Sequence, residues 1–314
     1  MKKFARYVHN VYHLRLEELI ALLFLIPSWL ITIKANLFFL EMGLNIPRKF
    51  YGGIIRLIVT IVMMVTFFYF IKKKPLWKYL YWLRDVMPFV FCIAIYTNLH
   101  DTIHFVNPHD IHDKLIAIDQ ALFGVQPVVW AQQFYHPWLT RYFSVSYLNY
   151  FVIAVIVVVY LLIKKRHAEM KKVLLGTILC FYFGYFLYIL FPAAPPRLTL
   201  ADQFVRDFGG GWLGAAQIKL VNISASSSRA AFPSLHCAVT LISLMYAYSM
   251  ERRLFYILLI PGISLFLATI YLRHHYAIDI IAGIILAIFT YFITPVLASK
   301  WQNFRSKQLL KNSS

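Results

Sequence analysis

The sequence predicts an all-α membrane protein, a polytopic bundle of about eight transmembrane helices. Hydrophobic residues make up 61% of the 314 residues and charged residues only 14%, which leaves too little polar surface for a water-soluble domain of this size. The apolar residues fall in long blocks, many of them near the roughly 20 residues that a helix needs to cross a bilayer. Trp and Tyr often lie near the block ends, where membrane and water meet.

The spans are expected at residues 18–40, 52–71, 85–99, 142–163, 173–192, 235–250, 254–272 and 277–297. The third and sixth are short. The first follows Glu17 and Glu18 and carries Lys34, so it does not read as a cleavable signal peptide. With no repeat and no long linker, we expect a two-helix N-terminal addition (1–84), a six-helix catalytic membrane core (85–299) and a basic cytoplasmic tail (300–314).

The distribution of basic residues predicts the topology. The net charge is +18. If the N-terminus is cytoplasmic, the inner segments hold 20 of the 31 Lys and Arg residues and the longer outer segments hold nine, as the positive-inside rule requires. Both termini are then cytoplasmic. The charge therefore reflects topology and contact with anionic lipid, and a nucleic-acid partner is excluded.

Two outer segments are long, 100–141 and 193–234, and we expect function on their face of the membrane. The histidines and aspartates of the first match no standard zinc spacing, so no metal or cofactor is predicted. Apolar residues at helical spacing from Leu115 to Trp130 predict an interfacial helix. The cysteines lie in or beside apolar spans and are expected to be small buried hydrophobes; they are Cys92, Cys180 and Cys237.

The second long outer segment ends in a helix-start pattern. Pro233 and Ser234 come just before an apolar run, which places Ser234 and His236 at a helix N-terminus. Free backbone N–H groups and the helix dipole favour an anion there. The segment therefore suits a phosphate group.

The turn between the seventh and eighth spans contains a second pattern. Asp279 follows His275 by four residues, so the two side chains share one face of a helix. The carboxylate can hold one ring nitrogen of His275 and leave the other free and basic, as in an activated nucleophile.

A third pattern lies at the end of the fifth span. Prolines stop the helix there, and Arg197 follows at the membrane edge, suited to forked contact with a phosphoryl group. Under the predicted topology all three patterns face the same, non-cytoplasmic side.

Taken together, these motifs resemble those of the type-2 phosphatidic acid phosphatase superfamily. The resemblance covers roughly residues 85–297 and is closer to the inositol phosphorylceramide synthase branch, which has a similar doubled histidine. The residues that carry it are Phe232 to His236, Ala268 to Asp279, Ala194 to Pro196, and Asp119 to Gly124 with Pro127 and Trp130.

The resemblance implies roles for individual residues. His275 would be the nucleophile that forms a phosphohistidine, Asp279 would orient it, and His236 would act as general acid and then base. Ser234 and Arg197 would hold phosphate oxygens. The superfamily usually has two further cations, at positions that are Leu190 and Thr269 here. Substitutes for these missing cations are proposed to be Arg229 and Arg273.

The expected function is transfer of a phospho-head-group, such as inositol phosphate, between membrane lipids through a phosphohistidine. A phosphatase acting on phosphatidic-acid-like or prenyl phosphates would use the same histidines, so the motifs leave this alternative open. A non-enzymatic lipid transporter or scaffold is the third reading, against which the complete His-His-Asp set speaks. The lipid donor and acceptor and the oligomeric state are not predicted.

Overall fold

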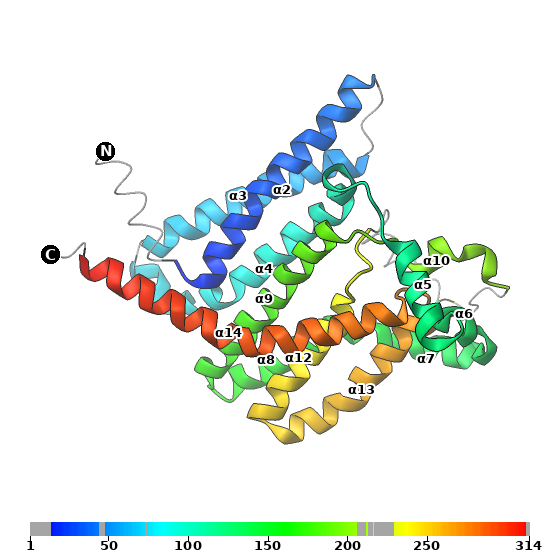
Figure 1. The fold of residues 1–314 in the computed structure, drawn as a ribbon. Helices are drawn as coiled ribbons and strands as arrows, with labels where there is room; N and C mark the ends of the chain where they lie inside the picture. Colours follow the sequence, from blue (N-terminus) through cyan, green and yellow to red (C-terminus); the bar gives the residue numbers. More distant parts are fainter. Residues whose placement is uncertain are drawn as a thin grey trace.

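The computed structural model describes residues 14–43, 48–72, 74–205 and 229–311, together with positions 212 and 216. Its described part is all-α, apart from one isolated β-bridge between Ala193 and Ala230 (Figure 1). The long helices are α2 (Leu16–Glu41), α3 (Arg48–Lys72), α4 (Lys74–Val106), α9 (His167–Leu190), α12 (Leu235–Met250), α13 (Arg252–Tyr271) and α14 (Ala277–Lys311). The shorter ones are α5 (His112–Phe123), α6 (Pro127–Trp130), η1 (Ala131–Phe134), α7 (Pro137–Leu148), α8 (Tyr150–Ile163), α10 (Pro196–Thr199) and η2 (Ala201–Gln203).

The predicted class, an all-α membrane bundle, is confirmed. Each predicted span coincides largely with helix, although residues 191–192 of the fifth lie beyond the end of α9 and residue 272 of the seventh lies beyond the end of α13. In the described part of the chain, four helices are long and apolar enough to cross a membrane, namely α2, α9, α13 and α14. A fifth span results if α7 and α8 together form one span, which is then bent by 46° between the two helices. The helices α3 and α12 have shorter apolar stretches.

Two predicted helices differ from the structure. The apolar stretch from Leu115 to Trp130 was expected to be one helix, but α5 ends at Phe123 because Gly124 adopts a left-handed conformation (φ 71°), which favours glycine. Pro127 then begins α6. The expected span 142–163 is likewise interrupted at Asn149, between α7 and α8.

The N-terminal helices are tied to the rest of the bundle by buried charge. Arg84 of α4 donates two hydrogen bonds to the Glu18 carboxylate of α2, at 2.7 and 3.0 Å, and Glu18 is fully buried. Arg15 pairs with the buried Asp85. Since α4 runs unbroken through residues 84 and 85, the division into an addition and a core at this point stays a prediction.

The bundle has two distinct ends. The indole of Trp301 in α14 donates to the Leu14 carbonyl just before α2, at 3.1 Å, so the last turns of α14 lie beside the start of α2. At the other end of α14, its first turn packs against α5 (Figure 1).

Close backbone contact joins α12 and α14 at this second end. The Ser234 amide donates to the Asp279 carbonyl at 3.0 Å. A Cβ atom at Gly283 would lie 2.5 Å from the Ser234 carbonyl oxygen, which is closer than any real Cβ contact. The absence of a side chain at Gly283 therefore allows the two helix starts to meet.

We expect Gly283→Ala to lower the thermal unfolding midpoint in detergent, because a backbone carbonyl cannot move aside and overpacking costs about 1–3 kcal/mol. Gly262→Ala is the matched control, since its added Cβ would meet the flexible end of Leu244 at 2.8 Å. Equal midpoints for the two variants would contradict the close packing of α12 on α14.

Candidate active site

The described structure brings the predicted catalytic residues together. His236 lies in the first turn of α12, two residues after Ser234, whose hydroxyl caps the helix by accepting the Cys237 amide at 3.4 Å. His275 lies in the short loop between α13 and α14, and Asp279 lies in the first turn of α14. The Nδ1 atom of His236 is 3.1 Å from Nε2 of His275.

Nδ1 of His275, the ring nitrogen away from His236, contacts two oxygen atoms. It lies 2.9 Å from the Ala231 carbonyl oxygen and 3.3 Å from Oδ2 of Asp279. The Asp279 carboxylate is itself held by the Tyr276 amide, which donates to the same Oδ2 at 3.0 Å. The predicted spacing of four residues thus places the carboxylate against the imidazole.

The hydrogen-bond partners of the two imidazoles determine which ring nitrogen carries the proton. A carbonyl oxygen only accepts, so Nδ1 of His275 carries the proton and Nε2 has the lone pair. Nδ1 of His236 must then donate to that lone pair, and Nε2 of His236 accepts from the Tyr147 hydroxyl at 2.7 Å. His275 therefore presents an unprotonated Nε2, the form that a nucleophile requires.

Burial keeps His275 neutral. Only 3% of its surface is exposed. Burial lowers the pKa of His275 to about 3, and the nearby positive charge of Arg197 acts in the same direction, while the hydrogen bond to the Ala231 carbonyl opposes both. The imidazole is therefore free of a competing proton throughout the physiological pH range.

Arg197 reaches the site from α10. Its Nη1 donates to Nδ1 of His274 at 2.9 Å, so His274 is in the tautomer with an unprotonated Nδ1. Burial lowers the pKa of Arg197. Burial and the charge of Arg197 together lower the pKa of His274 well below its usual value. Of the two adjacent histidines, His274 therefore contacts the guanidinium of Arg197, and His275 contacts the carboxylate of Asp279.

The other proposed phosphate-binding residues are placed differently. Ser234 is fully buried beside His236. Arg273 adopts a left-handed conformation (φ 61°) and stacks its guanidinium 3.9 Å from the centre of the Phe204 ring. Arg229 pairs with Asp110. None of these contacts tests a phosphate role, which remains a prediction for all three.

Three contacts at the site were not predicted from the sequence. One is the hydrogen bond from Tyr147 of α7, which lies in an ordinary apolar stretch and gives no local signal. Another is the bond between Arg197 and His274. The third is Asp119 of α5, which accepts two amides at the start of α14. Asp119 lies four residues after the buried Leu115, so its place on the inward face of the helix was a usable signal.

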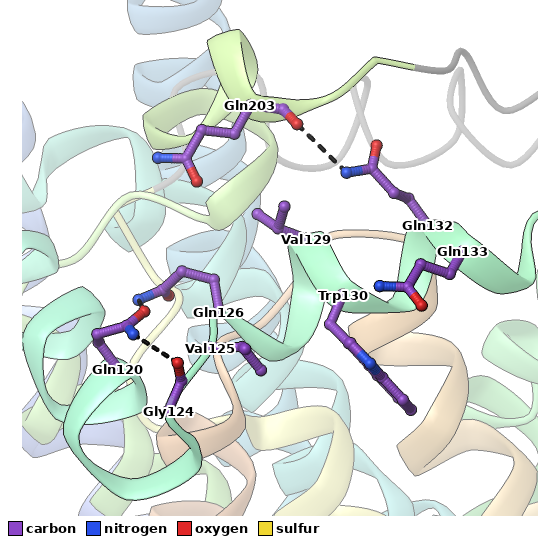
Figure 2. Close-up of a pocket in the computed structure, with 9 residues that line it drawn as sticks. All are labelled: Gln120, Gly124, Val125, Gln126, Val129, Trp130, Gln132, Gln133 and Gln203. Carbon is purple, nitrogen blue, oxygen red and sulfur yellow. Dashed lines mark hydrogen bonds between the residues drawn. The ribbon is translucent and has the colours of Figure 1, made fainter.

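A pocket of about 370 Å³ is lined by residues of α5, α6, η1 and η2 and of the segment between α5 and α6 (Figure 2). Among the described residues, its lining has no charged side chain. Five amide side chains surround an apolar floor that includes Val125 and Val129, with the exposed Trp130 at one edge. The amides are those of Gln120, Gln126, Gln132, Gln133 and Gln203.

The cysteines are free and buried, as expected. In the described part of the chain, no three His, Cys, Asp or Glu side chains are grouped so as to hold a metal ion. The side chains of His100, Asp101 and His104, part of the cluster considered in the sequence, lie outside the described residues.

A sequence profile of the PAP2 superfamily matches residues 113–293. This is more than half of the chain, and the chain therefore belongs to the PAP2 superfamily, as the motifs indicated. A PA-phosphatase related-family protein of Dictyostelium discoideum is 27% identical over 127 residues, which is 38% of this chain and 22% of that protein. The chain thus spans well under half of the length of this relative. No solved structure gives a significant match.

The low pKa of His275 predicts a pH dependence of stability. In the unfolded chain a histidine takes up a proton near pH 6.5, whereas folded His275 stays neutral to about 3. Stability is then fully present above pH 6.5 and falls on acidification, by at most about 1.4 kcal/mol per pH unit.

We therefore expect His275→Gln to lose less stability than the wild type between pH 7 and 5, measured as thermal unfolding in detergent. The exposed His109 provides the control variant His109→Gln, which should keep the wild-type slope. A wild-type slope for His275→Gln would mean that His275 is protonated when folded.

Proposed function

We propose that this protein is a membrane phosphotransferase that moves a phospho-head-group between lipids through a phosphohistidine at His275. The observation that carries the proposal is the direct contact of the two imidazoles, 3.1 Å between His236 Nδ1 and His275 Nε2, with Nδ1 of His275 held by a carbonyl and a carboxylate. Membership of the PAP2 superfamily supports lipid phosphoesters as substrates.

In the first step, Nε2 of His275 attacks phosphorus, and the bond from phosphorus to the leaving lipid oxygen breaks. The His236 ring must swing out of its direct hydrogen bond to let the phosphoryl group reach Nε2. His236 enters this step with the proton that it took from the acceptor hydroxyl in the preceding turnover, and gives that proton to the leaving oxygen. Asp279 stabilises the positive charge that develops on the phosphorylated imidazole.

In the second step, neutral His236 takes the proton of an acceptor hydroxyl, and the acceptor oxygen attacks phosphorus. The N–P bond breaks and neutral His275 is restored. Arg197 and Ser234, together with the positive end of the α12 dipole, would bind phosphate oxygens in both steps. Arg229 and Arg273 would add charge in place of the cations missing at Leu190 and Thr269.

Two observations favour a lipid acceptor over water. The nucleophile and its carboxylate are 3% and 0% exposed, and exclusion of water protects a reactive intermediate from hydrolysis. The uncharged pocket lined by five glutamines is suited to hydroxyl groups, since an amide both donates and accepts hydrogen bonds. Hydrolysis of phosphatidic-acid-like or prenyl phosphates is the second candidate, favoured by the name of the Dictyostelium relative.

The orientation in the membrane is also a proposal. We place both termini in the cytoplasm and the histidine pair at the extracellular, periplasmic or lumenal face. The excess of Lys and Arg in the segments on the terminal side supports this. The meeting of Trp301 with Leu14 at the end away from the histidines agrees with it.

The experiment uses purified full-length protein in detergent with phosphatidylinositol or phosphatidic acid, each with and without a ceramide or diacylglycerol acceptor. We expect a new phospho-head-group lipid to form only with an acceptor, and His275→Ala to reduce this activity by at least about 10⁴-fold, as for other catalytic nucleophiles. Mass spectrometry of the lipids measures the product. Gln302→Ala, at an exposed position on the far part of α14, is the control.

Release of inorganic phosphate from phosphatidic acid, dependent on His275 and unaffected by the acceptor, would replace the transferase by the phosphatase. Turnover that survives in His275→Ala would overturn both.

A further inference from the structure

The start of α14 is held by a carboxylate from a distant part of the chain. Asp119 of α5 accepts the Ala277 amide through Oδ2 and the Ile278 amide through Oδ1, both at 2.8 Å. Asp119 is fully buried, and 158 residues separate it from Ala277. Helix-start amides are normally capped in this way by the side chain of a residue at the helix start itself.

Asp279, the acidic side chain nearest to these amides in the sequence, has other hydrogen-bond partners. The first amides of a helix have no partner within the helix, and Asp279 is the acidic side chain of the first turn of α14. Its Oδ2 is engaged with His275 and with the Tyr276 amide. Because Asp119 satisfies the next two amides, Asp279 remains turned toward His275.

The position of the two amides makes the contact specific for the catalytic loop. Ala277 is two residues after His275, and Ile278 directly precedes Asp279. The carboxylate of Asp119 therefore binds the backbone between His275 and Asp279. The phenol of Tyr276 fixes the same loop from another side by donating to the Ala194 carbonyl at 3.1 Å.

The rest of α5 gives this contact a firm base. Leu115, on the same helix face as Asp119, is buried in a cluster with Tyr276, Val128 and Ala231. The same helix exposes large apolar side chains, Ile118, Leu122 and Phe123, as expected for a helix at a membrane surface. The contact therefore connects the outer helix to the nucleophile loop.

We propose that Asp119 is a positioning residue for the phosphotransfer reaction, which caps the Ala277 and Ile278 amides of α14 and so keeps Asp279 on the Nδ1 side of His275. The inference rests on the proposed function, but its structural part concerns the tautomer of His275 and is measurable without turnover.

The variants are Asp119→Ala, which removes both acceptors, and Asp119→Asn, which keeps one. The control is Asp113→Asn on the same helix, where the carboxylate is 93% exposed. We expect Asp119→Ala to lower kcat by at least about tenfold with KM within about twofold, because misplacement of a reacting group acts on the chemical step. Asp119→Asn should recover part of the loss, and Asp113→Asn should match the wild type.

A second readout does not depend on activity. The ¹⁵N signals of labelled histidines in micelles report which ring nitrogen carries the proton, with the His275 signal identified by its loss in His275→Gln. The wild type, Asp119→Asn and Asp113→Asn should show His275 protonated at Nδ1. Asp119→Ala should show a mixture of tautomers, because the loosened loop no longer holds Nδ1 of His275 against both the Ala231 carbonyl and the Asp279 carboxylate.

An unchanged tautomer in folded Asp119→Ala would overturn the proposal, as would a loss of activity that appears only in KM. If Asp119→Ala does not fold, the partial variant Asp119→Asn decides, since a wild-type kcat and tautomer there with a lowered unfolding midpoint would show a role in stability alone. Absence of turnover in the wild type would refute the proposed function while leaving the tautomer test standing.

Discussion

The site depends on one interaction, the hold that the Ala231 carbonyl and the Asp279 carboxylate have on Nδ1 of His275. Because a carbonyl oxygen cannot donate, this contact determines the proton position of the imidazole. It thereby sets the direction of the bond from His236 to His275 and of the bond from Tyr147 to His236. Burial then keeps the imidazole uncharged. An unprotonated, oriented nitrogen results from backbone geometry and one carboxylate.

That geometry requires two helix starts to meet. The amide of Ser234 bonds to the Asp279 carbonyl, and Gly283 removes the side chain that would separate α12 from α14. Each helix start carries the positive end of a helix dipole, and in both a side chain accepts first-turn amides, Ser234 in α12 and Asp119 in α14. Asp119 and Arg197 approach from α5 and α10, so outer segments complete a site that the bundle begins.

Much of this was predictable from the sequence because the signals are local. Apolar runs predicted the helices, and the spacing of His275 and Asp279 predicted their contact. The interruptions at Gly124 and Asn149 were missed because apolar periodicity continues across them. Tyr147 and Asp119 act through tertiary packing, between residues 89 and 158 positions apart, and no local pattern specifies such pairs. The pairing of Arg197 with His274 was missed for the same reason.

The most direct test of the account is to locate the phosphoryl group on the protein. Without an acceptor lipid the second step cannot proceed, so phosphatidic acid should leave the wild type phosphorylated. After a quench at alkaline pH, peptide mass spectrometry should find an acid-labile phosphate on His275 of the wild type, and none in His275→Ala. A phosphate on another residue, or turnover without any phosphorylated protein, would contradict the assignment of His275 as nucleophile.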